Sequence, residues 1–225
     1  MATSTVEDYL KCILVHELRS PGKLVTMGQV GAALRVAPGT VTAMVKTLAD
    51  SGLVEYEPYA GVRLSESGRK LGSHVLRRHR LVELFLVEIM GMDWSEVHGE
   101  AEQLEHVISD RLLERMDEML DHPAVDPHGD PIPSPQGVVV EPDLHNLLGC
   151  SVGTWMQVAR VSDQSSEFLQ LLERRGLLLG SRLRVASRDD LTETVDLDVE
   201  GGESMSLGFR AAAKIQVTAA PAAAS

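Results

Sequence analysis

The sequence predicts a multidomain α+β chain in which helical modules precede a small β-barrel. Three observations lead to this fold class. Apolar residues recur at helical spacing through much of residues 5–120. A proline-rich segment interrupts the pattern at 121–137, and the short alternating stretches that follow it are typical of strands. A chain of 225 residues, 44% of them hydrophobic, is long enough for two or three modules with cores of their own.

A helix-turn-helix is predicted close to the N-terminus. The spacing of apolar residues predicts helices over 5–18, 26–34 and 39–48. The break at 20–23 ends the first helix, and a tight turn at 35–39 joins the second helix to the third. Short, hydroxyl or basic residues remain on the outer face of the turn and third helix, namely Ala37, Pro38, Thr40, Thr42 and Lys46. Such a face can enter the major groove and approach phosphates and thymine methyl groups.

A two-stranded hairpin is predicted directly after the third helix. Residues 53–56 and 61–64 flank a turn, and the second of these stretches carries Arg63, a candidate phosphate contact. A helix-turn-helix followed by such a hairpin indicates a winged helix, which binds double-stranded DNA. The alternative is a small all-helical core that binds no DNA.

The charge of the chain is unevenly distributed. Its formal net charge is −12, which by itself argues against nucleic acid. Residues 1–80 nevertheless contain 11 Lys and Arg against 7 Asp and Glu, whereas the remainder contains 10 against 26. A phosphate-contacting surface is therefore expected in the N-terminal third, and the acidic remainder could attract cations.

Potential metal ligands gather on two predicted helices. The first helix, over about 65–90, carries His79 and Glu83 one turn apart. The second extends to about Leu120 and places four potential ligands on one stripe, namely His98, Glu102, Glu105 and His106. Glu102 and Glu105 would repel each other without a cation, and carboxylates with neutral imidazoles suit a divalent ion. The alternative is a solvated acidic face that happens to carry two histidines.

The apolar positions of these two helices exceed what a lone winged helix could cover, which predicts a homodimer. No membrane span is expected, because no run of about eighteen apolar residues occurs. The N-terminus lacks the basic and apolar regions of a secretory signal, and two distant cysteines support no disulfide framework. These features predict a cytoplasmic protein.

The last third of the sequence predicts the barrel. Strands are expected at 154–161, 182–185 and 213–217, with a helical insertion over 166–175. The final residues, 220–225, are alanine-rich and predict a disordered tail.

Taken together, the winged helix, the two helices with their histidines and glutamates, the proline-rich linker and the barrel resemble the diphtheria toxin repressor family of metal-dependent regulators. The string from Arg78-His79-Arg80-Leu81 through Val97-His98 to Glu105-His106 carries the resemblance. It implies a winged-helix domain at 1–66, a helical metal-binding and dimerisation domain at 67–121, a linker at 122–143 and an SH3-like barrel of the FeoA type at 144–219. It also implies a homodimeric repressor that binds palindromic operators when loaded with metal and controls metal homeostasis genes.

The resemblance further implies two metal sites. Asp8, Glu102, Glu105 and His106 would form the principal site, and His79, Glu83 and His98 would form a second, completed by residues at Asp126, His128 and Asp163. The iron branch of the family has methionine and cysteine where this chain has Asp8 and Glu102, so the match is to the manganese branch. Oxygen ligands independently suit Mn(II), with Fe(II) as the alternative. Short manganese regulators have a carboxylate where this chain has Lys11, which argues against a closely spaced metal pair.

Two other functions are compatible with parts of the sequence. The string Glu102-x-x-Glu105-His106 is similar to di-iron enzyme chemistry, but such sites normally place Glu-x-x-His on each of two helices. A winged-helix regulator that responds to a small organic ligand is the second alternative.

Overall fold

The computed structural model describes residues 3–220, and the chain divides into two compact units. The first unit comprises the chain up to Val82, Ala101–Met119 and Ile132–Val140. The second comprises Glu83–Glu100, Leu120–Pro131 and the chain from Glu141 onward. Among residues 3–220, none of the helices has the length and apolar character needed to cross a membrane.

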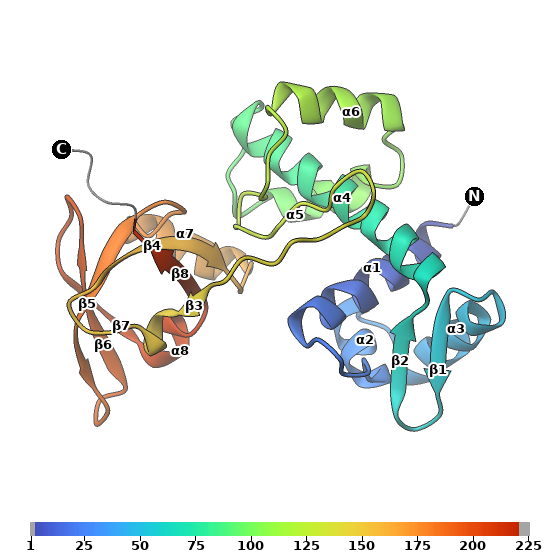
Figure 1. Cartoon of the computed structure of the whole chain (residues 1–225), viewed down its shortest axis with the longest axis horizontal. Helices are drawn as coiled ribbons and strands as arrows, with labels where there is room; N and C mark the ends of the chain where they lie inside the picture. Colours follow the sequence, from blue (N-terminus) through green and yellow to red (C-terminus); the bar gives the residue numbers. More distant parts are fainter. Residues whose placement is uncertain (1–2, 221–225) are drawn as a thin grey trace. The chain divides into compact units, whose positions relative to one another are not determined.

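The first module is the predicted winged helix-turn-helix, formed by α1 (Ser4–Arg19), α2 (Met27–Leu34), α3 (Pro38–Asp50), β1 (Val54–Glu57) and β2 (Gly61–Leu64) (Figure 1). The Thr26 side chain and Gln29 form a capping box that starts α2. Pro38 occupies the first turn of α3, where its missing N–H leaves no helical hydrogen bond unmade. Leu10, Ile13 and other fully buried apolar residues form the core of this module.

A buried carboxylate fastens the wing to the first helix. Glu17, on α1, accepts a hydrogen bond of 2.8 Å from the backbone N–H of Leu64 at the end of β2. The same carboxylate contacts the guanidinium of Arg69 at the start of the next helix. Because Glu17 is buried, these two partners are what compensate its charge for the loss of water.

The helical region consists of α4 (Glu66–Glu88), α5 (Val97–Leu104) and α6 (Asp110–Met119). The prediction of one helix continuing to about Leu120 is therefore wrong. Helix α5 ends at Leu104. The next helix, α6, begins after Ser109, whose hydroxyl oxygen accepts a hydrogen bond from the backbone N–H of Leu112 at 3.3 Å. A serine cap followed by Asp110 in the first turn is a local signal for a new helix.

The proline-rich segment is packed against other parts of the chain for much of its length. Residues 126–129 and 131–133 are buried. Gly129 has a φ of +87°, and a β-carbon there would lie 2.0 Å from the carbonyl oxygen of Ala159, so only glycine fits. The backbone N–H of Val161 also donates to the carbonyl of His128 at 2.9 Å. These contacts hold Asp126 and His128 in fixed positions.

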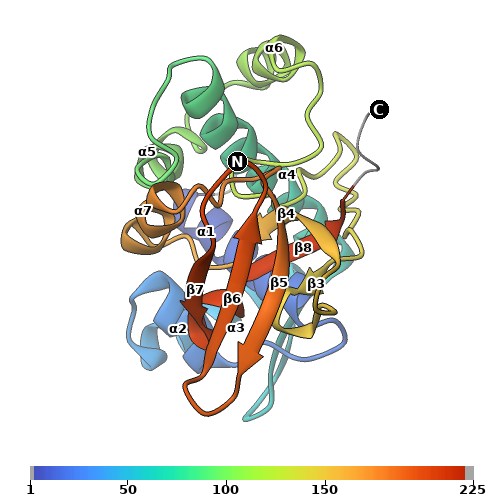
Figure 2. The ribbon, with the colours of Figure 1, turned by 90° about the vertical axis from the view of Figure 1, so that its left-hand side faces the viewer.

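The C-terminal region is a six-stranded antiparallel sheet in the order β3-β8-β4-β5-β6-β7. Its strands are β3 (His145–Asn146), β4 (Trp155–Val161), β5 (Arg182–Asp189), β6 (Thr194–Val199), β7 (Met205–Gly208) and β8 (Ile215–Ala219). Strands β5, β6 and β7 lie side by side in Figure 2. The predicted helical insertion is α7 (Ser166–Arg174), and η1 (Leu147–Gly149) and α8 (Phe209–Ala212) are two further short helices.

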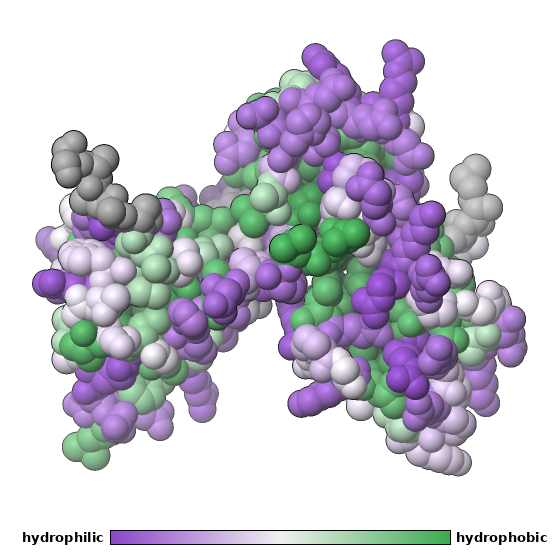
Figure 3. Space-filling model, viewed as in Figure 1, coloured by the Kyte–Doolittle hydropathy of each residue, from purple (hydrophilic) through white to green (hydrophobic). Residues whose placement is uncertain are grey.

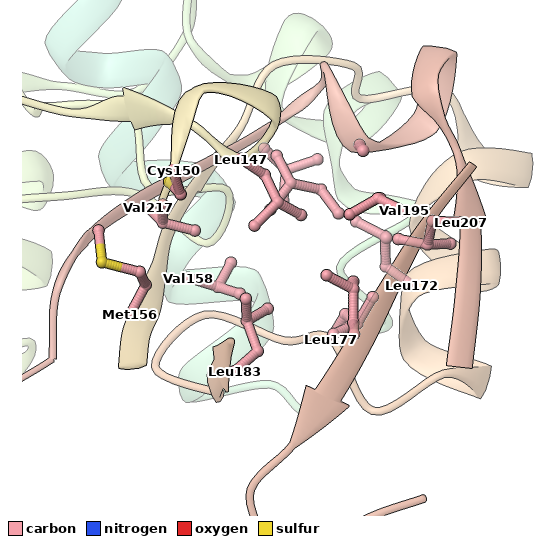
Figure 4. Packing of buried hydrophobic residues seen from close by; sticks show 14 of the residues in the cluster. Leu147, Cys150, Met156, Val158, Leu172, Leu177, Leu183, Val195, Leu207 and Val217 are labelled. Atoms are coloured by element: carbon pink, nitrogen blue, oxygen red, sulfur yellow. The ribbon is translucent and has the colours of Figure 1, made fainter. Parts of the chain in front are cut away.

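The sheet and its short helices enclose one hydrophobic core. Side chains from η1, β4, α7 and β5, including Leu147, Val158, Leu172 and Leu183, point toward one another in Figure 4. Strands β6 and β7 are absent from the sequence prediction. In β6 the acidic residues Asp196 and Asp198 lower strand propensity, although they alternate with the buried Val195 and Leu197.

Two apolar surfaces remain exposed. No residue of α6 is buried, and its Leu112 and Met119 are each 48% exposed. Val138 and Val140 are also exposed, in the segment that precedes the strands of the sheet. Figure 3 shows hydrophobic patches among the hydrophilic residues on the face in view. The predicted disordered tail lies outside the described residues apart from Ala220.

Candidate metal centres

The first cluster of potential ligands joins α1 to the turn after α5. Asp8 lies in the first half of α1, and His106 Nε2 is 2.9 Å from its Oδ1. The same nitrogen is 3.3 Å from Oε1 of Glu105, whose side chain is completely buried. Asp8, Glu105 and His106 can therefore each direct one ligand atom to a common point. Three members of the predicted principal set come together, from segments about a hundred residues apart.

Glu7 also belongs to this cluster, although the sequence analysis does not include it. His106 Nδ1 donates to Oε2 of Glu7 at 2.7 Å, on the side of the ring away from Asp8. A carboxylate on Nδ1 fixes the orientation of the imidazole and leaves Nε2 toward Asp8 and Glu105. The available signal was the helical face itself, because Glu7, Asp8 and Lys11 fall on one side of α1.

Glu102, the fourth predicted member, contacts a lysine. Nζ of Lys11 lies 2.7 Å from Oε1 of Glu102, and 2.7 and 2.9 Å from the two oxygens of Glu105. His79 donates from Nδ1 to Oε2 of Glu105 at 2.6 Å, and Nζ lies 3.5 Å from the same nitrogen. Within this first cluster, His79, Glu102 and Glu105 form a further possible donor set, and the ammonium group of Lys11 lies among them.

Throughout this cluster, burial and neighbouring charges shift the pKa values of the side chains in opposite directions. Burial raises the pKa of Asp8, and the nearby His106 and Lys11 only partly offset it. Burial acts to lower the pKa of Lys11, but the carboxylates of Glu105 and Glu102 outweigh it and raise that pKa. For His106 burial is likewise outweighed, by Glu7, Glu105 and Asp8, so its pKa is raised. The carboxylates of the cluster thus favour the protonated, positively charged forms of His106 and Lys11.

The second cluster is formed by Glu83, Asp126 and His128, all of them buried. Nε2 of His128 donates to the carbonyl oxygen of Trp94 at 3.0 Å. Its Nδ1 makes no hydrogen bond although it is buried, and it faces Oε2 of Glu83 at 3.9 Å. A metal-binding imidazole typically donates through one ring nitrogen, as Nε2 does here to the Trp94 carbonyl, which leaves the lone pair of the other nitrogen for the metal. His98 lies beside this cluster, with Nδ1 at 3.1 Å from Oε1 of Glu83.

Asp126 and Asp163, both expected at the second site, have different surroundings. Asp126 accepts hydrogen bonds through Oδ1 from the backbone N–H groups of His128 and Asp130, at 2.8 and 3.0 Å. Asp163 is ion-paired with Lys214 and accepts from the backbone of Ser165 at 2.9 Å. These contacts outweigh the effect of burial and lower the pKa of Asp163. Asp163 is thus held by a lysine and is outside the donor sets formed by the described residues.

Both clusters fit a divalent ion by the chemistry of their donors. Each offers carboxylate oxygens and imidazole nitrogens, and no thiolate takes part in any donor set among residues 3–220. Cys12 is buried, and its burial raises the pKa of the thiol to about 11, so it remains protonated near neutral pH. Hard oxygen donors with imidazole suit Mn(II), whereas thiolates would favour softer ions.

The predicted DNA-contacting residues lie at the exposed start and outer face of α3. Ala37, Pro38, Thr40 and Lys46 are exposed. The Thr42 hydroxyl donates to the carbonyl of Pro38 at 2.9 Å. On the wing, Arg63 pairs with Glu55 and Glu57 at 2.7 and 3.0 Å. Because all three side chains are about half exposed, these ion pairs are weak and a phosphate could compete for the guanidinium.

A winged helix joined to helices that carry buried carboxylate and imidazole clusters defines a class of metal-dependent DNA-binding proteins. Three family models match consecutive parts of the chain. "Iron dependent repressor, N-terminal DNA binding domain" matches residues 1–62, and "Iron dependent repressor, metal binding and dimerisation domain" matches residues 65–134. "FeoA domain" matches residues 145–219.

Individual proteins agree with these models. The diphtheria toxin repressor of Corynebacterium efficiens is 31% identical over 193 residues, which cover 83% of this chain and 82% of that protein. The iron-dependent repressor IdeR of Mycobacterium leprae is 32% identical, with coverage of 87% and 75%. A solved structure of a manganese-dependent transcriptional repressor complexed with manganese has a TM-score of 0.88 at 39% identity, covering 95% of this chain and 99% of that one. The chain therefore belongs to the diphtheria toxin repressor family of iron-dependent repressors.

Proposed function

We propose that the chain is a homodimeric transcriptional repressor that senses Mn(II), with Fe(II) as the alternative ion, and controls metal homeostasis genes through palindromic operators. One observation carries the proposal. Asp8, on the first helix of the DNA-binding module, meets Glu105 and His106 from the metal-binding and dimerisation domain in a cluster without sulfur. Fixing the DNA-binding module through this cluster would set how its recognition helix is presented.

The principal site is proposed to use Asp8, Glu105 and His106, with Glu102 at its edge. A bound divalent ion would compensate the combined negative charge of these carboxylates. His106 is held by Glu7 so that Nε2 remains directed to the site. For the second site, His79, Glu83, His98, Asp126 and His128 are the proposed ligands, whereas Asp163 is ion-paired with Lys214.

A second copy of the chain is the proposed partner of α6. This helix has no buried residue in the single chain, although Leu112, Leu113, Met116 and Met119 are apolar. A dimer would place two α3 helices in successive major grooves, about 34–36 Å apart, as a palindromic operator requires. Exposed Lys46 and Arg63 are the proposed phosphate contacts.

A selection experiment tests the proposal and isolates the operator in the same step. Fragments of the source genome are passed over the immobilised chain with MnCl₂, eluted with EDTA, and the enriched duplex is used in fluorescence anisotropy. We expect Mn(II) to raise its DNA affinity about 5–150-fold, the usual range of such coupling. Asp8→Ala and Glu102→Ala should abolish this stimulation while circular dichroism shows the fold retained.

Glu100→Ala is the matched control, because Glu100 is an exposed carboxylate of α5 outside the donor sets formed by the described residues. A normal Mn(II) response in the Asp8→Ala protein would contradict the assignment of the site. Enrichment of the same duplex without metal would favour the regulator of a small organic ligand. Oxygen consumption or hydrolysis by the Mn(II)-loaded protein would favour the enzyme with a carboxylate-bridged metal pair.

A further inference from the structure

We propose that Lys11 is a built-in cation that takes the place of a second metal ion beside the principal site, so that this centre binds one divalent ion and is already assembled without it. The inference rests on the proposed function for its metal-dependent part, and on the geometry of residues 11, 79, 102 and 105 alone for its metal-free part. All four residues belong to the same compact unit.

The first step is the position of the ammonium group. Nζ of Lys11 lies within 2.9 Å of three carboxylate oxygens, one from Glu102 and two from Glu105. Those two glutamates and His79 are a complete donor set for a metal ion by composition and spacing. The ammonium group of a lysine side chain, rather than a free ion, thus lies among three side chains that could bind a metal.

The second step is burial. The side chain of Glu105 is fully buried, and those of His79 and Lys11 are 7% and 10% exposed. A buried carboxylate without a counter-charge is strongly destabilising, and removal of one partner from a buried pair leaves that cost in place. Lys11 therefore compensates Glu105 in the metal-free chain and keeps α1 joined to the turn after α5.

The third step is the charge that remains for an added ion. Lys11 cancels one of the two negative charges of Glu102 and Glu105, and Asp8 and Glu7 add two more. One divalent ion near Asp8, Glu105 and His106 would offset most of the remaining negative charge, whereas a second ion beside the ammonium would meet its positive charge at short range. Glu105 can serve both sides, because its Oε1 lies 2.7 Å from Nζ and 3.3 Å from His106 Nε2.

Three substitutions at one position separate the parts of this proposal. Lys11→Met removes the charge at similar length, Lys11→Arg keeps it, and Lys11→Glu replaces the cation with a ligand. Lys70→Met is the matched control, because Lys70 is an exposed lysine of α4. The readouts are thermal unfolding in EDTA, the number of Mn(II) ions bound per chain relative to wild type, and the electron paramagnetic resonance spectrum.

In EDTA we expect Lys11→Met to unfold at a lower temperature than wild type, with Lys11→Arg close to wild type and Lys70→Met unchanged. With Mn(II), Lys11→Glu should bind one more ion per chain than wild type and show the exchange-coupled spectrum of a manganese pair. Wild type should show only uncoupled Mn(II). If Lys11→Glu does not fold in EDTA, it is refolded with Mn(II) present, and Lys11→Met alone still tests the metal-free part.

The outcomes distinguish failure of this inference from failure of the proposed function. Unchanged melting of Lys11→Met in EDTA would overturn the structural role of the ammonium. Coupled Mn(II) in wild type would overturn the claim that Lys11 excludes a second ion. If wild type and Asp8→Ala bind the same amount of Mn(II) while Lys11→Met is destabilised, the proposed function fails, and the metal-free role of Lys11 stands.

Discussion

At the scale of single residues, the site is governed by how buried charges find partners. Glu105 is compensated by Lys11 and His79, and His106 by Glu7 and Asp8. In each case a side chain on α1 or α4 meets one from the turn after α5. The pairing explains why the pKa values of Lys11 and His106 are raised although burial opposes positive charge.

Glu7 is expected to act as a positioning residue for His106. Glu7→Gln should weaken Mn(II) binding about 10–100-fold, the usual effect of removing the partner of a metal-binding imidazole. Isothermal titration calorimetry gives the affinity, with Glu100→Gln as the control. An unchanged affinity in Glu7→Gln would mean that the ring is held by its packing alone.

At the scale of elements, the winged helix is held together by a carboxylate that links three of them. Glu17 of α1 accepts from Leu64 of β2 and pairs with Arg69 of α4. The wing that carries Arg63 is thereby fixed to the helix that carries Asp8 and Lys11. Local sequence could predict each of these elements, because their apolar spacing is regular. It could not predict that Glu17 joins them, because its partners lie 47 and 52 residues away.

Glu17→Ala is therefore expected to destabilise the chain by about 1–3 kcal/mol, the cost of leaving a buried N–H unpaired. Glu17→Gln should lose less, because its amide oxygen can still accept from Leu64. Urea unfolding followed by circular dichroism measures both variants. Equal stability of Glu17→Ala and wild type would show that water replaces the carboxylate.

At the scale of the whole molecule, metal binding and DNA binding are expected to be coupled. The proposed ligands come from the DNA-binding domain and from the metal-binding and dimerisation domain, so an ion that favours the DNA-competent dimer must in turn be favoured by DNA. The selected duplex should therefore tighten Mn(II) binding by the same factor by which Mn(II) tightens DNA binding.

Titrations of Mn(II) with and without the duplex, and of the duplex with and without Mn(II), measure the two factors. The Asp8→Ala protein provides the uncoupled reference. Factors that differ beyond error in wild type would show that the two ligands do not act through one conformational equilibrium.

Regular periodicity by itself determined the winged helix, the long helix that follows it and the presence of strands near the C-terminus. It also determined the choice of metal-type ligands, because carboxylates and imidazoles at helical spacing are visible in the sequence. The tertiary structure alone decided that Glu7 supports His106 and that Lys11 lies among Glu102, Glu105 and His79. The reason is physical: helical spacing reports neighbours three or four residues apart, whereas buried charges are compensated by partners that only folding brings near.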